Sequence, residues 1–252
     1  MGFDGSGAIV TGAGSGIGRA VAVRLAAGGA HVAAADVDAG RLDELGTTCV
    51  DGPGSLTPIR ADVSKPADVD ELVAAAAALG DGLRIVCNVA GILDAMAPVH
   101  EVDDEQWARV LGVNLNGPFH VCRRAVPELL RAGGGSIVNV ASIAALKGGT
   151  AGTAYTVSKH ALIGLTRSIA WMYADAGIRC NAVCPGGVAT SIGTSAPVRS
   201  QSGTTRMGPG LAQAVRTGRP EEVAGVVAFL ASADASLVNG AVVTADAGWS
   251  AG

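Results

Sequence analysis

Short apolar runs alternate with helix-like segments along the whole sequence, and this alternation leaves the chain few possible folds. Most runs are apolar at successive residues instead of at every second residue, which is typical of strands buried on both faces. Strands and helices in this order predict a parallel sheet covered on both sides. We therefore expect an α/β, doubly wound, Rossmann-like sheet of about seven strands, in a single domain that spans residues 1–252.

The sequence also predicts where these elements lie. Strands are expected at residues 7–11, 31–36, 57–61, 84–89, 136–141, 178–184 and 241–245. Helices are expected at 17–28, after Pro66, at about 103–131, at 152–173 and at 220–232. Because the 103–131 segment contains Pro118 and Pro127, we expect that helix to be bent or broken.

A glycine-rich turn separates the first strand from the first helix. It fits the pattern T-G-x-x-x-G-x-G, whereas the common G-x-G-x-x-G spacing fails because residue 17 is Ile. Glycines let a backbone approach a pyrophosphate at a helix N-terminus. The turn therefore predicts a dinucleotide site that includes Gly12, Ser15, Gly16, Ile17 and Gly18. An ordinary glycine-rich turn is the alternative.

The second strand ends at Asp36, eighteen residues after Gly18. A carboxylate there can accept hydrogen bonds from both ribose hydroxyls of an adenosine, and it repels a 2′-phosphate. Val37 and Asp38 follow, so no Arg stands directly after the strand to receive a phosphate. These residues predict NAD as the cofactor in preference to NADP. A solvated turn carboxylate is the alternative.

A second group of polar residues follows the strand at 136–141. Ser142 stands where that strand ends, and Tyr155 and Lys159 are four residues apart in the next predicted helix. That spacing puts both side chains on one helix face. An ammonium beside a phenol favours the phenolate and lowers its pKa. The three side chains predict acid–base chemistry on an alcohol oxygen, although Tyr-x-x-x-Lys alone is a short pattern.

Composition excludes several classes of protein. Only 16% of the residues are charged and the net charge is −4, so we expect no nucleic-acid partner. Apolar runs are too short to span a membrane, and the N-terminal residues lack a signal-peptide pattern, so we expect a cytoplasmic protein with no membrane partner. The five cysteines are an odd number, which favours reduced thiols. Cys180 and Cys184 lack a further ligand pair, so we expect no metal site.

Taken together, the motifs resemble those of the classical short-chain dehydrogenase/reductase family, from Thr11 to Gly248. The stretch Asn88-Val89-Ala90-Gly91 resembles the family's N-N-A-G turn, with Val89 in place of the second Asn. The resemblance implies a catalytic tetrad of Asn114, Ser142, Tyr155 and Lys159. It also implies further cofactor contacts from Asp62, Val63, Asn88, Ala90, Gly91, Tyr155, Lys159, Pro185, Gly186, Val188 and Thr190.

The resemblance also implies a reaction, which is hydride transfer between NAD(H) and a secondary alcohol or ketone. Tyr155 would exchange the alcohol proton, Ser142 would hold the substrate oxygen, and Lys159 would lower the Tyr155 pKa and bind the nicotinamide ribose. Asn114 and a water would relay the proton outward. One alternative is a 3-oxoacyl-(acyl-carrier-protein) reductase, which Asp36 disfavours because that activity usually accompanies NADPH. Another is a non-catalytic NAD-sensing protein, which the complete tetrad disfavours.

Substrate contacts are expected from residues 92–98, from 144–149 and from the loop region at about 187–219. Between residues 176 and 220 the chain has five arginines and no Asp or Glu, which suggests either a cationic lid for an acidic or thioester substrate or a solvated loop. The resemblance implies a homotetramer, with a dimer as the alternative, in which the 103–131 and 152–173 helices pair across one interface. We expect the C-terminal strand and the tail with Trp249 to form the second interface.

Overall fold

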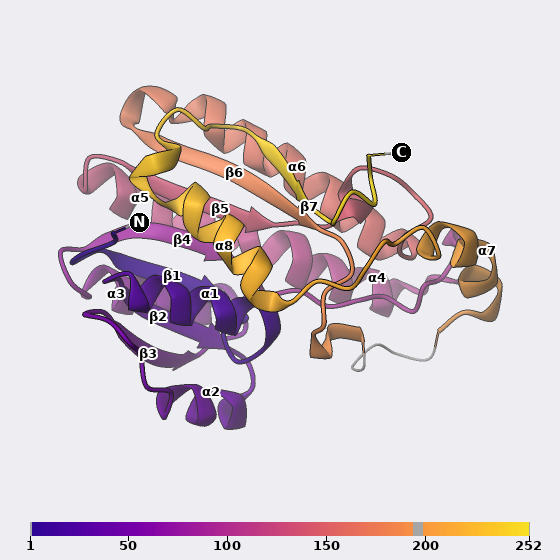
Figure 1. Cartoon of the computed structure of the whole chain (residues 1–252), viewed down its shortest axis with the longest axis horizontal. Coiled ribbons are helices and arrows are strands. Elements are labelled where there is room, and N and C mark those ends of the chain that lie inside the picture. The colour runs from indigo at the N-terminus through magenta and orange to yellow at the C-terminus, as the bar shows by residue number, and fades with distance from the viewer. Residues whose placement is uncertain (1, 194–198, 252) are drawn as a thin grey trace.

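The computed structural model describes residues 2–193 and 199–251, which form one sheet of parallel strands with helices on both faces (Figure 1). The strands of the described residues are β1 Gly7–Thr11, β2 His31–Asp36, β3 Ser55–Arg60, β4 Leu83–Asn88, β5 Gly135–Val140, β6 Ile178–Pro185 and β7 Val242–Ala245. Their order in the sheet is β3-β2-β1-β4-β5-β6-β7. The predicted α/β, doubly wound architecture is therefore confirmed. The order reverses between β1 and β4, and such sheets bind ligands at the carboxyl ends of the strands beside that point.

One face of the sheet is covered by three helices, α1 Gly16–Ala27, α2 Ala39–Gly46 and α8 Pro220–Ala231. α1 and α8 pack against each other over the middle of the sheet (Figure 1). Leu25, Leu45 and Leu230 are buried in the apolar cluster between these helices and the strands. Full burial of such a side chain stabilises the fold by about 1.5–3 kcal/mol.

The other face is covered by α3 Pro66–Ala77, α5 Gly117–Arg131 and α6 Thr153–Met172. Leu72, Leu129 and Ile169 contribute one side chain from each helix to a second buried cluster. Because helices cover both faces of the sheet and exclude water, the strands need apolar side chains on both faces. α6 lies over β6, and its N-terminal end is therefore held near the carboxyl ends of the strands.

The long helix expected at 103–131 is interrupted, as predicted, but at a different residue from either proline. It consists of α4 Asp104–Leu111, a π-helical turn η2 Gly112–Asn116 and α5. Pro118 lies in the first turn of α5, where its missing N–H costs no intrahelical hydrogen bond. Pro127 lies inside α5, which continues past it to Arg131. The interruption is therefore the π turn, a feature that is frequent at functional sites.

Two helices occur where the sequence analysis expected none. α2 follows β2 directly, and α7 Gln201–Leu211 lies within the region expected to be a loop, of which residues 194–198 are outside the described residues. Three glycines and a proline in α7 weaken its helical pattern. Short helical turns complete the described chain: η1 Val99–Glu101, η3 Ile143–Ala145, η4 Ala174–Ala176, η5 Ser191–Gly193 and η6 Ala233–Ala235.

No helix in the part of the chain that the structure describes is long and apolar enough to cross a membrane.

Candidate active site

A pocket of about 600 Å³ runs along the carboxyl ends of the central strands. All but two of the residues predicted as catalytic or cofactor-binding line it: Gly12, Ser15, Gly16, Ile17, Gly18, Asp36, Asp62, Val63, Ala90, Gly91, Ser142, Tyr155, Lys159, Pro185, Gly186, Val188 and Thr190. Asn88 and Asn114 lie behind the pocket wall. The topology thus brings residues up to 180 positions apart into one cavity, since Gly12 and Ile192 both line it.

At one end of the pocket, the glycine turn has no room for side chains. A Cβ on Gly18 would lie 2.0 Å from the carbonyl oxygen of Gly12, so only glycine allows this approach of helix and turn. Ser15 is the N-cap residue of α1, but its side chain makes no capping hydrogen bond. The first N–H groups of α1 therefore remain available to an anion, and the helix dipole favours one there.

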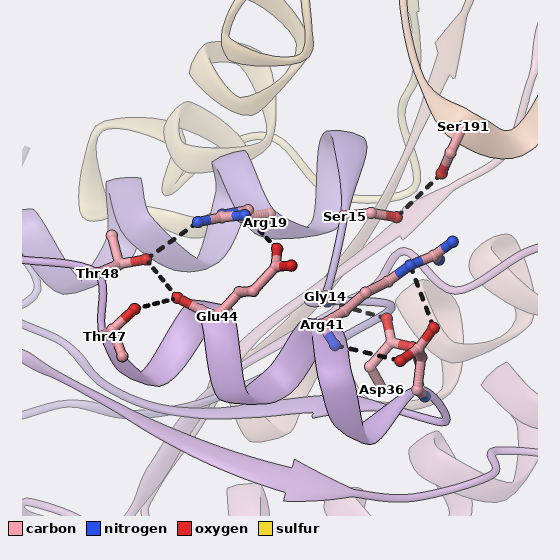
Figure 2. Close-up of polar contacts among 10 residues, drawn as sticks. Gly14, Ser15, Arg19, Asp36, Arg41, Glu44, Thr47, Thr48 and Ser191 are labelled. Carbon is pink, nitrogen blue, oxygen red and sulfur yellow. Dashed lines mark hydrogen bonds and ion pairs between the residues drawn. The ribbon is translucent and has the colours of Figure 1, made fainter.

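The start of the 187–219 region lies against this turn. The Ser15 and Ser191 hydroxyl oxygens are 3.4 Å apart (Figure 2), and a Cβ on Gly16 would lie 2.9 Å from Cγ2 of Thr190. Thr190 and Ser191 follow the end of β6 by a few residues, so the chain leaving β6 crosses the pocket to reach the turn. Predicted pocket residues from both ends of the sequence meet here.

Asp36 is held beside the same turn by backbone groups. Its Oδ2 accepts a hydrogen bond from the Gly14 N–H at 2.9 Å, and its Oδ1 accepts one from the Asp38 N–H at 3.0 Å (Figure 2). Each carboxylate oxygen keeps a second lone pair for another donor. The carboxylate is therefore oriented toward the pocket before any ribose hydroxyl arrives.

Arg41 also lines this end of the pocket, although the sequence analysis did not identify it. Its Nε lies 3.3 Å from Oδ2 of Asp38, and its β-carbon packs at Gly14, next to Asp36. Figure 2 shows its side chain extending past Asp36 toward Ser15. The sequence held a signal for Arg41. A residue in the first turn of a helix that directly follows a strand lies near the end of that strand. It was missed because α2 was not predicted.

Asp62 and Val63 line the pocket beyond Asp36. Oδ1 of Asp62 accepts hydrogen bonds from the backbone N–H and the hydroxyl of Ser64, at 3.0 and 2.6 Å. The Asp62 N–H donates a hydrogen bond to Oδ2 of Asp68 at 2.9 Å. This short turn after β3 is thus rigid, and it presents the Val63 side chain and the Asp62 backbone to the pocket.

Asn88 is buried in the sheet and does not reach the pocket. Its amide nitrogen donates to Oδ1 of Asn139 at 2.8 Å, and Asn139 donates to the Thr166 hydroxyl at 2.9 Å. These bonds link β4, β5 and α6 through the core. From this position, the Asn88 side chain does not make the predicted cofactor contact. The neighbouring turn is held instead by the Thr11 hydroxyl oxygen, which accepts the N–H groups of Val89 and Ala90.

Ser142, Tyr155 and Lys159 form the other end of the pocket. Ser142 is the N-cap residue of η3, where its Oγ accepts the Ala144 N–H at 3.1 Å. Lys159 Nζ lies 5.6 Å from the centre of the Tyr155 ring and donates to the Val140 carbonyl at 2.9 Å. The predicted i, i+4 pair on one face of α6 is therefore present, and the hydroxyl at the end of β5 faces it.

Burial controls the acidity of this group. Burial raises the pKa of Tyr155 to about 12; the Ser142 hydroxyl lowers that pKa, whereas the charges of Asp94 and Cys184 raise it. Burial also lowers the pKa of Lys159 to about 8. The net shift of the Tyr155 pKa is therefore opposite to the sequence-based expectation. The reason is that the low-dielectric surroundings disfavour phenolate and ammonium alike.

Asn114 lies in the π turn η2, directly behind the catalytic end. Its amide makes a pair of hydrogen bonds with the backbone of Ile92, accepting the N–H at 2.9 Å and donating to the carbonyl at 3.0 Å. It also donates to the Ser158 hydroxyl at 3.2 Å. The side chain therefore joins η2, the loop after β4 and α6.

The predicted substrate segments do meet around Tyr155, and their surface is apolar. Met96, Ala144 and Met207 form a buried cluster with Tyr155, and further apolar side chains pack on it from the loop after β4 and from α7: Ile92, Leu93 and Leu211. Side chains of α7 thus pack in the same cluster as Tyr155.

The arginines between residues 176 and 220 are largely engaged elsewhere. Arg179 donates to the carbonyl oxygens of Leu230, Ser232 and Val238 at 3.0–3.1 Å, and this explains its partial burial. Arg216 pairs with Glu222 at 2.8 Å, and Arg219 lies 3.8 Å from the same carboxylate. Three of the five arginines therefore have partners within the chain, and the choice between a cationic lid and a solvated loop stays a prediction.

Cysteines 87, 122, 180 and 184 are buried free thiols, and Cys49 is exposed and free. Within the described residues, no group of three or more His, Cys, Asp or Glu side chains is arranged to hold a metal ion.

Known proteins resemble this chain over almost its full length. The family described as enoyl-(acyl carrier protein) reductase matches residues 12–250. The 3beta-hydroxysteroid dehydrogenase 2 of Eggerthella lenta is 42% identical, over 97% of this chain and 94% of that protein. The cyclohexanol dehydrogenase of an Acinetobacter species is 39% identical, over 97% of this chain and 94% of that protein. A solved structure from Beutenbergia cavernae, provisionally named as an NAD(P)-dependent gluconate 5-dehydrogenase and holding NADP at low occupancy, is 37% identical with a TM-score of 0.85, over 100% of this chain and 99% of that one. This chain therefore belongs to the classical short-chain dehydrogenase/reductase family of oxidoreductases.

Proposed function

We propose that this protein transfers hydride between NAD(H) and a secondary alcohol or its ketone, with Tyr155 as the acid–base group. The observation that carries the proposal is the single pocket that has the glycine turn and Asp36 at one end and Ser142, Tyr155 and Lys159 at the other. A family member that had lost catalysis would not need to keep these three side chains together. The NAD-sensing alternative therefore lacks a specific observation in its favour.

The residues present fit a dinucleotide. The uncapped N-terminus of α1 would hold the pyrophosphate, and Asp36 would accept the adenosine ribose hydroxyls. Asp62 and Val63 would lie along the adenine, and Pro185, Gly186, Val188 and Thr190 would lie beside the nicotinamide. Asp36 supports NAD, whereas the nearby Arg41 would favour the extra phosphate of NADP.

Each catalytic side chain has a defined task in this proposal. The nicotinamide supplies the hydride acceptor for oxidation, or the hydride for reduction. Ser142 Oγ donates a hydrogen bond to the substrate oxygen, and the Tyr155 phenolate takes the hydroxyl proton as the carbonyl forms. The Lys159 ammonium offsets the phenolate charge where little water screens it. Asn114 holds the loop after β4 against α6, and a water beside it would pass the proton outward.

The substrate surface favours an apolar, uncharged alcohol. Side chains of the loop after β4 and of α7 that reach Tyr155 are aliphatic or thioether groups, including Ile92, Leu93 and Met207. The relatives named for steroid and cyclohexanol substrates agree with this surface. The 3-oxoacyl thioester alternative would need cationic contacts; Arg179 and Arg216 are engaged within the chain, whereas Arg206 lines a neighbouring pocket with Met96 and Met207.

A substrate panel tests the function directly. Nicotinamide absorbance would be followed with alicyclic and sterol secondary alcohols, their ketones, a 3-oxoacyl thioester and an enoyl thioester, each with NAD(H) and NADP(H). We expect turnover of alicyclic alcohols with NAD and little turnover of either thioester. Exclusive turnover of a thioester would contradict the proposal, as would binding of NAD without turnover of any alcohol or ketone.

We also propose a homotetramer built on the outer helix faces. Trp171 and Met172 at the end of α6 are 85% and 69% exposed, and Phe119 and Leu130 of α5 are also exposed. Leu162 and Ile169 of α6 are buried inside the chain and are not part of this surface. Pairing of α5 and α6 with a second copy would cover the exposed set, at about 25 cal/mol for each Å² of apolar area.

The second interface would use α8 and the end of the sheet, where Phe229 and Leu237 are exposed. Trp249 is not available for it, contrary to the expectation, because its indole is buried and donates to the Gly210 carbonyl at 3.0 Å. Light scattering at micromolar concentration tests the assembly. A tetrameric mass is expected for the wild type and a smaller one for Trp171→Glu. A monomeric wild type would contradict the assembly without affecting the catalytic proposal.

A further inference from the structure

Asp94 is a buried carboxylate that the proposed mechanism does not use. It is completely inaccessible to solvent, and it lies in the loop after β4, outside the residues that line the cofactor pocket. A buried carboxylate is costly unless several donors surround it. The hydrogen-bond partners of Asp94 therefore indicate its role.

All the hydrogen bonds of the Asp94 side chain come from backbone N–H groups, and two lie at the start of the helix that carries Tyr155. Oδ2 accepts the N–H of Tyr155 itself at 2.9 Å. Oδ1 accepts the N–H of Gly152 at 3.2 Å and that of Met96 at 3.0 Å. The carboxylate thus satisfies orphan donors at the N-terminus of α6, where the helix dipole also favours negative charge.

The segment 94–97 extends this connection to the substrate side. The Ala97 carbonyl accepts both the N–H and the hydroxyl of Thr153 in the first turn of α6, at 3.0 and 3.1 Å. The Ala95 carbonyl accepts the Ser200 N–H at 2.7 Å, at the start of α7. Met96, between them, has a φ of 56°, an uncommon backbone conformation for a residue other than glycine. Such strain persists only where surrounding contacts hold it.

We propose that Asp94 is a positioning residue for Tyr155, which ties the catalytic helix to the substrate loop and adds a negative charge at the start of that helix. The inference deepens the proposed function and rests on it, because it assigns to Asp94 the placement of the proposed acid–base group. Asp94 touches neither substrate nor cofactor in this arrangement. It acts through the backbone of α6 and through its field.

The electrostatic effect has a definite sign. Of the other titratable groups near the phenol, Cys184 from β6 raises its pKa, and Lys159 Nζ from α6 lies 5.6 Å from the centre of the ring. The α4 and α7 helices contribute the apolar Val110 and Met207. After burial, the Asp94 charge is among the causes that raise the Tyr155 pKa. Loss of the charge would therefore lower that pKa, although loss of the hydrogen bonds would misplace the phenol. Rate and pH profile should respond in different directions.

Asp94→Asn changes both the charge and the hydrogen bonds, and the pH profile and the rate report these two changes separately. The amide keeps the size of the carboxylate but has one oxygen for three N–H donors. We expect kcat for alcohol oxidation to fall about tenfold or more, as catalysis is sensitive to small misplacement, with NAD affinity nearly unchanged. We also expect the acidic limb of the kcat/KM profile to move to lower pH. Asp103→Asn is the matched control, since Asp103 caps α4 through the Gln106 N–H and does not act on Tyr155.

An unchanged kcat, or a lower kcat with an unmoved acidic limb, would overturn the proposal. If Asp94→Asn does not fold, Gly152→Ala replaces it, because a Cβ there would lie 2.4 Å from Oδ2 of Asp94 and displace the carboxylate without removing its charge. A wild-type kcat in that variant would overturn the proposal as well.

A titration without substrate separates this proposal from the proposed function. The chain has two tyrosines, so in a Tyr173→Phe background the ultraviolet absorbance of tyrosinate reports Tyr155 alone. With NAD bound, we expect a lower midpoint when Asp94 is replaced by Asn. An unchanged midpoint would overturn the role of Asp94. Failure of the wild type to oxidise any alcohol in the panel would overturn the function and leave this titration interpretable.

Discussion

The two ends of the pocket differ in their exposure to water. At the catalytic end, Tyr155 and Lys159 are 8% and 3% exposed. Burial raises the pKa of Tyr155 and lowers the pKa of Lys159, and both shifts favour the neutral form of the group. At the adenosine end, Val37 is 59% exposed and the Arg41 side chain 43%. The Asp36 carboxylate at this end is also buried, at 9% exposed, and is oriented by backbone hydrogen bonds, whereas the Arg41 guanidinium remains in contact with water.

This difference has consequences for the size of any substitution effect. Electrostatic interactions are stronger where water is excluded and are screened where it is present. We therefore expect substitutions at the catalytic end to change turnover by orders of magnitude, and substitutions at the adenosine end to change cofactor preference by smaller factors. The following predictions descend in that order.

Tyr155→Phe should have the largest effect. We expect kcat to fall by about 10²–10⁴, the usual contribution of a positioned acid–base group, because the phenyl ring has no proton to exchange. NAD affinity, measured by fluorescence titration, should change little. Tyr173→Phe, the only other tyrosine substitution in the chain, is the control. Turnover within a few-fold of wild type would remove Tyr155 from the mechanism.

Lys159→Met should lower turnover and yet stabilise the fold at neutral pH. The folded-state pKa of Lys159 is about 8, below its ordinary value of 10.5, so the ammonium opposes folding below pH 8 and this penalty disappears as pH rises toward 10.5. We expect a gain of about 1–3 kcal/mol at pH 7, after the lost Val140 hydrogen bond is subtracted. Denaturant unfolding of wild type and variant across that pH range measures it, with the exposed Lys65→Met as control. A variant that is less stable than wild type at neutral pH would contradict the burial argument.

The pH dependence of the two reaction directions should differ. Alcohol oxidation needs the phenolate, and burial raises the Tyr155 pKa to about 12, so its rate should increase with pH through the neutral and alkaline range. Ketone reduction needs the protonated phenol and should persist to high pH. Initial rates in both directions across a pH series measure this. An oxidation rate that is independent of pH would show that proton transfer from another group, or another step, limits turnover.

Asp36→Ala should act at the adenosine end with a smaller effect. We expect NAD to bind about tenfold more weakly, since two oriented acceptors are lost, and NADP to bind more tightly because the repulsion of its 2′-phosphate is relieved. Titration of both cofactors measures the change. Asp43→Ala, which removes an exposed charge from the same α2 helix, should change neither affinity. A wild-type protein that prefers NADP would show that Asp36 does not decide the choice.

Arg41→Ala should have the smallest effect, and the salt concentration should reveal its origin. We expect NADP affinity to fall about threefold at low ionic strength and less at high ionic strength, because the guanidinium is partly exposed and screened. NAD affinity should stay the same. Arg19→Ala is a close control, since Arg19 contacts Thr48 and Glu44 outside the pocket (Figure 2). Equal losses for both cofactors would assign Arg41 a purely structural role in the turn.

Much of the fold could be predicted from local patterns. Strand positions agree with the structure to within two residues at each end, because continuous apolar runs of five to eight residues have few other uses in a chain with this alternation. α7 could not be predicted in this way. Gly203, Gly208 and Pro209 obscure its helical pattern, and contacts with the loop after β4 compensate for their weak propensity.

Local spacing likewise determined the parts of the site that a single turn or helix builds. The glycines of the phosphate turn, the strand-end position of Asp36 and the i, i+4 pair of Tyr155 and Lys159 each depend on neighbours a few residues away. Tertiary structure alone decided the rest. It placed Asn88 in the core instead of the pocket, brought Arg41 beside Asp36, and set Asp94 on the backbone of Tyr155, 61 positions away. It also decided the direction of the Tyr155 pKa shift, because desolvation depends on every segment that packs around the phenol, and no local pattern records that sum.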